Sequence, residues 1–244
     1  MIVIQMPNPV STAEFGSSIV AVGDINPAIF SADWLFHNQL IGDGDRDAAI
    51  KSPATVVSHQ ATVCETDWFR LQALPNQLAI ASKNALSPAL RDLAEGIFLL
   101  LPHMPVTAIG FNFHGHYQVS NEADWHKVGD TLAPKAIWKE IFPEGDYYVG
   151  LANLQVKATH GSRGDALNSA TDGITIQVMP SGLVKPGVFL TLNDHRGSLT
   201  SEIGEKNPAE KAAALVAAEW DQTWDFATRT FEALLNKTIA YEGS

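Results

Sequence analysis

The sequence predicts an α+β fold, an antiparallel or mixed β-sheet with long amphipathic helices packed mainly on one face. Three observations support this prediction. Runs of β-branched and aromatic residues recur between glycine, proline and asparagine, as in strands joined by turns. Segments 88–101 and 209–236 instead carry apolar residues at spacings of three and four, as one-sided helices do. The 244 residues are 45% hydrophobic and 18% charged, which is typical of a packed globular protein.

The first half of the chain predicts one short helix among several strands. Ser31 can cap a helix over 32–40, because its hydroxyl can accept a hydrogen bond from a free amide of the first turn. Residues 42–53 have the composition of a polar loop, and residues 1–17 that of a lead-in arm. β-branched runs between turn signals predict strands at 2–5, 18–22, 54–65, 68–73 and 77–82.

A long amphipathic helix, 88–101, closes this half. Ser87 occupies the expected N-cap position and Pro88 the first turn, where a missing amide hydrogen costs nothing. The apolar residues of one face are Leu90, Leu93, Ala94, Ile97 and Leu101. We expect this face to pack against the sheet.

The second half predicts a similar order of elements. Asn121 can cap a helix over 122–132, and Pro134 begins a short helix that ends near Phe142. Strands are expected at 106–119, 147–159, 174–179 and 188–192. Polar, glycine-bearing loops are expected at 160–171 and 193–206.

The longest predicted helix, 209–236, follows Asn207 and Pro208. Its apolar stripe consists of Ala213, Val216, Trp220, Trp224, Ala227, Phe231 and Leu234. Such a stripe indicates burial against the sheet or against a partner. Trp220, Trp224 and Phe231 are therefore the candidate interface residues, expected to point into the interior or into a subunit interface.

The order of elements suggests one domain, 1–244, with two similar β-α-β-β-α halves at 18–103 and 106–236. The triplet Ala-Asp-Trp occurs at 32–34 and again at 123–125, 91 residues apart (124 − 33). Each copy follows a β-branched strand that contains glycine. A tripeptide also recurs by chance, so the duplication is a hypothesis.

Charge and cysteine content restrict the class of partner. The net charge of −11, from 27 acidic and 16 basic residues, disfavours nucleic acid and anionic membranes. It is compatible with a protein partner or with self-association into a homo-oligomer. The lone Cys64 excludes an intramolecular disulfide and fits a reducing compartment. We therefore expect a soluble, cytoplasmic protein.

His114 and His116 are the strongest candidate site residues. Residues i and i+2 of a strand point to one face, so both imidazoles could reach one metal ion. Further ligands could come from Glu122, Asp194 or His195, but the sequence does not bring these together. Because a stable site needs three or four ligands, we predict two histidines on a half-exposed strand and no bound metal.

A second polar group, Asp194, His195 and Arg196, directly follows an apolar strand. Active-site residues often occupy such a position, and so do ordinary turn residues. Phosphate-cradling glycine motifs and a nucleophile elbow are both missing from the sequence, so no cofactor is predicted.

The sequence therefore favours a non-enzymatic, intracellular protein that binds a protein partner or assembles with itself. Two alternatives stay open. The first is a metal-dependent enzyme or metal-binding protein that uses His114 and His116. The second is a protein that holds a small apolar ligand between the C-terminal helix and a curved sheet.

Overall fold

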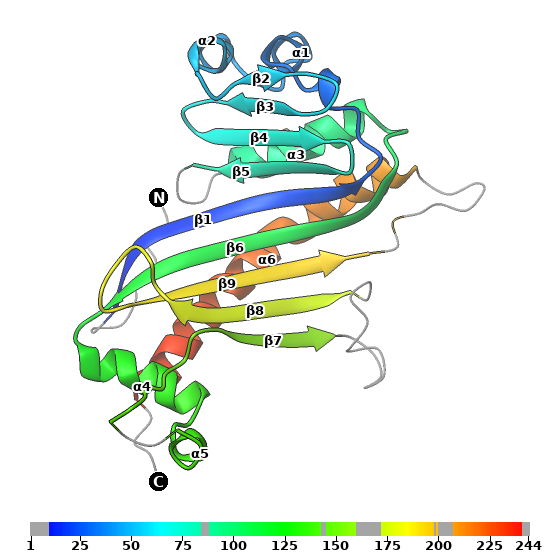
Figure 1. Cartoon of the computed structure of the whole chain (residues 1–244). Coiled ribbons are helices and arrows are strands. Elements are labelled where there is room, and N and C mark those ends of the chain that lie inside the picture. Colours follow the sequence, from blue (N-terminus) through cyan, green and yellow to red (C-terminus); the bar gives the residue numbers. More distant parts are fainter. Residues whose placement is uncertain are drawn as a thin grey trace.

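The protein has an α+β fold in which one antiparallel sheet is backed by two long helices (Figure 1). The computed structural model describes residues 10–83, 88–142, 145–159, 172–197, 199 and 207–240. In these ranges nine strands form a single sheet in the order β2-β3-β4-β5-β1-β6-β9-β8-β7. The long helices α3 and α6 both lie behind it. The predicted fold class, with helices mainly on one face, is confirmed.

The elements fall into two runs along the chain. The first comprises β1 (Val10–Gly23), the 3-10 turn η1 (Pro27–Ile29), α1 (Ala32–His37), α2 (Asp43–Lys51), β2 (Val56–Val57), β3 (Thr62–Glu65), β4 (Phe69–Leu74), β5 (Gln77–Ser82) and α3 (Pro88–Leu100). The second comprises β6 (Val106–Val119), α4 (Glu122–Leu132), α5 (Ala136–Lys139), β7 (Leu154–Thr159), β8 (Gly173–Pro180), β9 (Gly187–Arg196) and α6 (Pro208–Ile239).

The two runs share one element order: a long strand, two short helices, further strands and a long helix. The short helices α1 and α2 lie at the β2 edge of the sheet, and α4 and α5 at the β7 edge (Figure 1). The repeated triplets open α1 and α4. Ser31 Oγ accepts the Trp34 amide hydrogen at 3.1 Å, and Asn121 Oδ1 accepts that of Asp124 at 2.8 Å. Both capping predictions are therefore correct, and the duplication itself stays a hypothesis.

The central strands β1 and β6 divide their side chains between two faces. They pair antiparallel from Val10 opposite Val119 to Gly23 opposite Val106. Since directly opposed residues share a face, Ile19 on β1 packs beside Phe111 on β6, and both are buried. This face carries the hydrophobic core against the helices.

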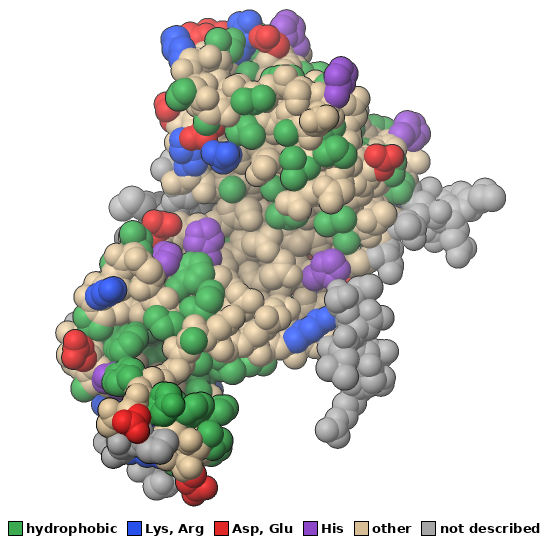
Figure 2. Space-filling model, viewed as in Figure 1, with side chains coloured by type: hydrophobic (Ala, Val, Ile, Leu, Met, Phe, Trp, Pro, Cys, Tyr) green, Lys and Arg blue, Asp and Glu red, His purple; other side chains and the backbone are tan. Residues whose placement is uncertain are grey.

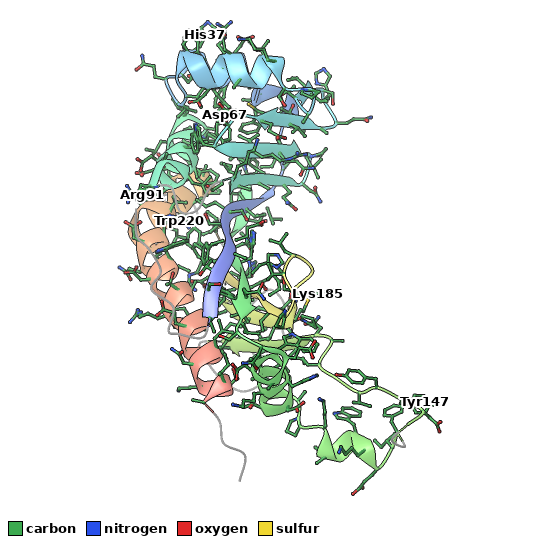
Figure 3. The ribbon with its side chains drawn as sticks, turned by 90° about the vertical axis from the view of Figure 1, so that its left-hand side faces the viewer. His37, Asp67, Arg91, Tyr147, Lys185 and Trp220 are labelled. Atoms are coloured by element: carbon green, nitrogen blue, oxygen red, sulfur yellow. The ribbon has the colours of Figure 1, made fainter. Side chains whose placement is uncertain are left out.

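Helix α6 supplies the largest side chains of that core. Trp220 and Phe231 are fully buried and Trp224 is 5% exposed. The Trp220 ring lies 5.1 Å from that of Phe113, and Trp220 stands between the helix and the sheet (Figure 3). Of the two alternatives for these candidate interface residues, interior or subunit interface, the structure places all three in the interior.

The N-terminus of α6, which follows Asn207 and Pro208 as expected, is capped by the side chain of Glu210. The backbone amide of Asn207 donates to Glu210 Oε2 at 3.0 Å, and Pro208 occupies the first helical position. The predicted cap at Ser87 lies outside the described residues, as do the predicted strand at 2–5 and the loop at 160–171.

The first strand begins earlier than predicted, because residues 10–17 belong to β1 and not to a lead-in arm. A register shift between Thr12 and Glu14 adds a residue to the ladder. The buried residues Val10 and Phe15 are consequently five positions apart, which conceals the two-residue period of a strand.

The predicted polar loop at 42–53 is also wrong, because most of it forms helix α2. Glycines and three aspartates lower helix propensity here. The position of the acids outweighs that cost, because Asp43 and Asp45 lie in the first turn, where the helix dipole favours negative charge. Asp45 Oδ2 also accepts the Gly42 amide hydrogen at 3.3 Å.

Three strand boundaries differ from the prediction as well. The segment 54–65 contains two strands, β2 and β3, separated by a turn in which Ser58 Oγ accepts the amide hydrogens of Gln60 and Ala61. Only the last part of 147–159, Leu154–Thr159, is a strand. Conversely, β9 runs to Arg196, into residues that the sequence assigned to a loop.

Candidate functional site

The face of the sheet turned away from α3 and α6 is open over its centre (Figure 2). Small and neutral polar residues of β1, β6 and β9 line this open face. They are Gly16, Ser18, Gly110, Asn112, His114, His116, Thr191 and Asn193. Asn193 Nδ2 donates to Asn112 Oδ1 at 2.6 Å, so neighbouring strands are also joined through their side chains.

The imidazole of His114 lies next to Gly16 of the neighbouring strand on this open face. A Cβ atom built on Gly16 would stand 2.4 Å from His114 Cε1, so the imidazole occupies the space that the glycine leaves. Burial lowers the pKa of His114, and the charge of nearby Glu14 opposes that shift only in part. The imidazole is therefore neutral at pH 7.

His116 is fixed by two contacts. Its ring stacks on Phe189 with centroids 4.3 Å apart, and its Nδ1 lies 2.8 Å from Ser181 Oγ. Ser181 Oγ already accepts the amide hydrogens of Leu183 and Val184, each at 3.1 Å. Both lone pairs of the hydroxyl are thus in use, so it donates its own hydrogen to His116 Nδ1.

Ser181 was not identified from the sequence, because its contact with His116 spans 65 positions. Its hydroxyl organises the turn between β8 and β9 and is almost fully buried. That geometry gives Ser181 a structural role in holding the turn against the open face.

The two candidate histidines share the open face, but the other suggested ligands lie elsewhere. Glu122 begins helix α4, and Asp194 belongs to the helix-covered face. His195 pairs with Gly110, four residues along β6 from His114. Across the described ranges, no group of three or more His, Cys, Asp or Glu residues is placed to hold a metal ion.

The predicted polar group at the end of β9 is split between the two faces of the sheet. Arg196 Nη1 lies 2.8 Å from Asp194 Oδ1, and Arg196 Nε donates to Glu219 Oε2 on α6 at 3.0 Å. Thr223 Oγ1, also on α6, donates to Asp194 Oδ2 at 3.3 Å. His195 faces the opposite side, because successive strand residues alternate.

Asp194 and Arg196 therefore tie β9 to α6 instead of forming a cleft with His195. Asp194 is 2% exposed, and its burial raises the pKa of the carboxyl group. The attraction of Arg196 and the hydrogen bond from Thr223 lower it by less.

The most exposed apolar surface we identify lies on the segment that joins α4 to β7. Six large apolar side chains there are between 36% and 80% exposed. They are Ile137, Trp138, Ile141, Phe142, Tyr147 and Tyr148, and we call the described residues 136–142 and 145–148 the aromatic segment. Tyr147 stands at the far end of this segment, well away from the sheet (Figure 3).

Short-range contacts hold the aromatic segment in place. Lys135 Nζ lies 2.9 Å from Asp130 Oδ1 on α4, and the Phe142 amide donates to the Trp138 carbonyl at 2.8 Å. Tyr148 Oη lies 3.4 Å from His126 Nε2. Helix α5 has only four residues, so it offers no continuous face with which to bury its own apolar side chains.

Two hollows adjoin the aromatic segment. One, of about 280 Å³, is lined by Ala133, Lys135, Trp138 and residues 149–153. A smaller one, of about 50 Å³, includes Trp125, His126, Tyr148 and Leu151 in its lining. The two share Lys135, Gly150 and Leu151. The larger hollow has room for one apolar side chain from outside.

An apolar pattern at helical spacing marks this surface in the sequence, within the short helix expected from Pro134 to near Phe142. Ile137, Trp138, Ile141 and Phe142 follow one another at helical spacing, which predicts a buried helix face. Burial requires another element opposite that face, and a single sequence does not reveal whether one is there. The exposed surface and the buried tryptophans of α6 thus had similar apolar patterns.

Comparisons with other proteins add no assignment. No protein-family model matches the chain, and no curated protein matches it. Within the described ranges, no helix is long and apolar enough to cross a membrane.

Proposed function

We propose that this protein is an intracellular protein-binding module that docks a partner on the aromatic segment. The observation that carries the proposal is the exposure of six large apolar side chains on one projecting segment. Isolated proteins rarely leave apolar patches of more than a few hundred Å² in water, and larger patches commonly mark interaction sites. Tryptophan and tyrosine, both present here, are also enriched among the residues that dominate binding energy.

The size of the patch supports a specific interface. A large side chain presents about 200 Å² when free, so the exposed fractions correspond to roughly 700 Å². A standard complex buries about 800 Å² on each partner. The adjoining hollow of about 280 Å³ supplies the kind of pocket in which an anchoring side chain is desolvated.

The open face supports the same proposal. The aromatic segment and the turn that carries Lys185 project from the sheet on the side opposite α6 (Figure 3). A partner bound to the segment can therefore extend over the neutral polar centre of the sheet. There the side chains of Asn112 and Asn193 offer hydrogen bonds.

The proposed function includes an intracellular location, which the state of Cys64 fits. Cys64 is a buried free thiol, and burial raises its pKa to about 11. Such a thiol behaves as a small core residue, and a lone thiol kept reduced fits the reducing compartment that we propose.

The proposal is tested by identifying a partner and reconstituting the complex from pure components. The partner is obtained by cross-linking to the full chain in the native host, and its dissociation constant is measured by calorimetry. Trp138→Ala combined with Tyr148→Ala should weaken binding at least a hundredfold, because each side chain is placed to act as a hot spot worth about 2 kcal/mol.

The matched control removes exposed apolar side chains elsewhere, Ile50 on α2 and Phe226 on α6. Ile50→Ala combined with Phe226→Ala should leave the dissociation constant unchanged. Circular dichroism should show both double variants folded. If the reconstituted complex tolerates loss of Trp138 and Tyr148 as well as it tolerates the control, the proposed site is wrong.

A further inference from the structure

We infer that the partner of the aromatic segment is a basic protein, which inserts one apolar side chain into the hollow beside Trp138. This inference rests on the proposed function and adds the chemistry of the partner. It is carried by the charges around the segment and by the shape of the surface.

The surroundings of the aromatic segment are negatively charged. Between positions 122 and 148 the sequence has six acidic and three basic residues, a net charge of −3 (3 − 6). The whole chain carries −11. Apolar side chains that would attract many kinds of partner are thus displayed in a field that attracts cations.

Internal pairing leaves this net charge unchanged, because each ion pair neutralises one basic and one acidic side chain. Lys135 Nζ lies 2.9 Å from Asp130 Oδ1, and Lys127 Nζ lies 3.6 Å from Asp124 Oδ1, so these cations are partly neutralised within the chain. Glu122, Glu140 and Asp146 are exposed carboxylates on the same part of the molecule. A partner therefore meets apolar side chains with exposed carboxylates around them.

These charges disfavour two other occupants of the surface, a second copy of the chain and an anionic lipid membrane. A second copy would bring the same carboxylates and the same net charge of −11 to the contact. An anionic lipid surface would be repelled in the same way. A basic protein gains attraction from the carboxylates, which speeds its encounter, while the apolar contacts provide the affinity.

The hollow specifies how such a partner is anchored. Its lining combines Trp138 with Ala133, Lys135 and residues 149–153. A leucine or aromatic side chain fits within this volume, where contact with the lining would remove part of its water. The partner surface is therefore basic with an apolar anchor at its centre.

The test uses two model peptides with the full-length chain. One is an 18-residue amphipathic helix of leucine and lysine with a single tryptophan, and the other has glutamate in place of every lysine. Fluorescence anisotropy measures each dissociation constant at low and at high salt. The cationic peptide should bind at least tenfold more tightly at low salt, and this advantage should shrink as salt screens the charges.

Variants locate the binding on the protein. Glu140→Gln with Asp146→Asn should weaken binding of the cationic peptide about fivefold or more, and Trp138→Ala about tenfold. The control, Asp67→Asn with Asp225→Asn, removes the same charge from exposed sites outside the segment and should change binding less than twofold. Equal affinity for both peptides, or equal effects of the two charge variants, would overturn the inference.

Further outcomes separate this inference from the proposed function. Two results would overturn the inference that the partner is basic. One is a dimer, seen by sedimentation, that is lost with Trp138→Ala, and the other is co-flotation with phosphatidylglycerol vesicles. An acidic native partner whose binding needs Trp138 would also overturn it, yet leave the proposed function standing. A native partner that binds without Trp138 and Tyr148 would overturn both.

Discussion

At the residue scale, the sheet sorts neighbours in the sequence onto opposite faces. Asp194 and Arg196 bond to α6, whereas His195 between them belongs to the open face. Three consecutive polar residues therefore reach the same site only if the backbone leaves the strand conformation at that point. The run looked like a loop, and its assignment failed because β9 continues to Arg196.

The burial of Asp194 predicts how stability depends on pH. Its pKa is raised in the folded protein, so folding favours the protonated carboxyl group. The contribution of this group to the free energy of unfolding should fall as pH rises from about 3.9, the ordinary aspartate value, through the raised pKa. Asp194→Asn removes that titration.

Urea denaturation of both proteins between about pH 3 and pH 7 measures this effect. The wild type should lose stability relative to Asp194→Asn as pH rises across this window. A relative gain for the wild type with rising pH would show that Arg196 outweighs desolvation.

The close contact of Gly16 with His114 predicts that substitutions at these two positions have coupled effects on the free energy of unfolding. A Cβ at position 16 would overlap the His114 ring, so Gly16→Ala should cost about 1–3 kcal/mol, as overpacking typically does. In a His114→Ala background the ring is gone, and the same change should cost much less. Chemical denaturation of the four proteins in this double-mutant cycle provides the comparison.

Gly44→Ala serves as the control, because a Cβ there meets nothing within 4 Å and the residue lies in α2. It should be neutral or stabilise the protein by about 0.5–1 kcal/mol. Equal costs of Gly16→Ala with and without His114 would mean that the imidazole moves aside freely.

At the element scale, periodic segments with clear caps were predictable. The long helices and β6 follow from their spacing, and the cap at Asn121 lies where the sequence places it. The failures have local physical causes. A register shift hides the start of β1, and acid–dipole interactions form α2 from residues with low helix propensity.

The aromatic segment could not be found from one sequence for a different reason. Its residues satisfy the same apolar spacing as a core helix, and exposure depends on whether another element covers them. Helix α6 illustrates the opposite case, since its tryptophans were candidates for an interface and lie inside the sheet-helix core. Apolar periodicity predicts that one face of a helix is favourable to bury. It does not predict whether the same chain or a partner covers that face.

The packing of α6 predicts a large difference between two aromatic residues on that helix. Trp220 is fully buried against Phe111 and Phe113, so Trp220→Ala should lower the free energy of unfolding by about 3–5 kcal/mol. Phe226 is 40% exposed on the outer side, and Phe226→Ala should cost well under half as much. Similar costs for both would contradict the assigned helix face.

At the scale of the whole molecule, one face of the sheet is covered and the other is open. Helices α3 and α6 are joined by Arg91 and Asp221, 2.8 Å apart, and both pack on the same side (Figure 3). The open side carries neutral polar residues at its centre, and the aromatic segment projects on this side. The molecule thus has one side on which helices cover the core, and an open side on which we propose that a partner docks.

Hydrogen–deuterium exchange on the reconstituted complex tests this division most directly. Partner binding should slow amide exchange in residues 136–151, with smaller effects in the turn at 181–186 and none on the outer face of α6. Slowed exchange confined to the β2 edge or to the outer face of α6, with residues 136–151 unchanged, would contradict it.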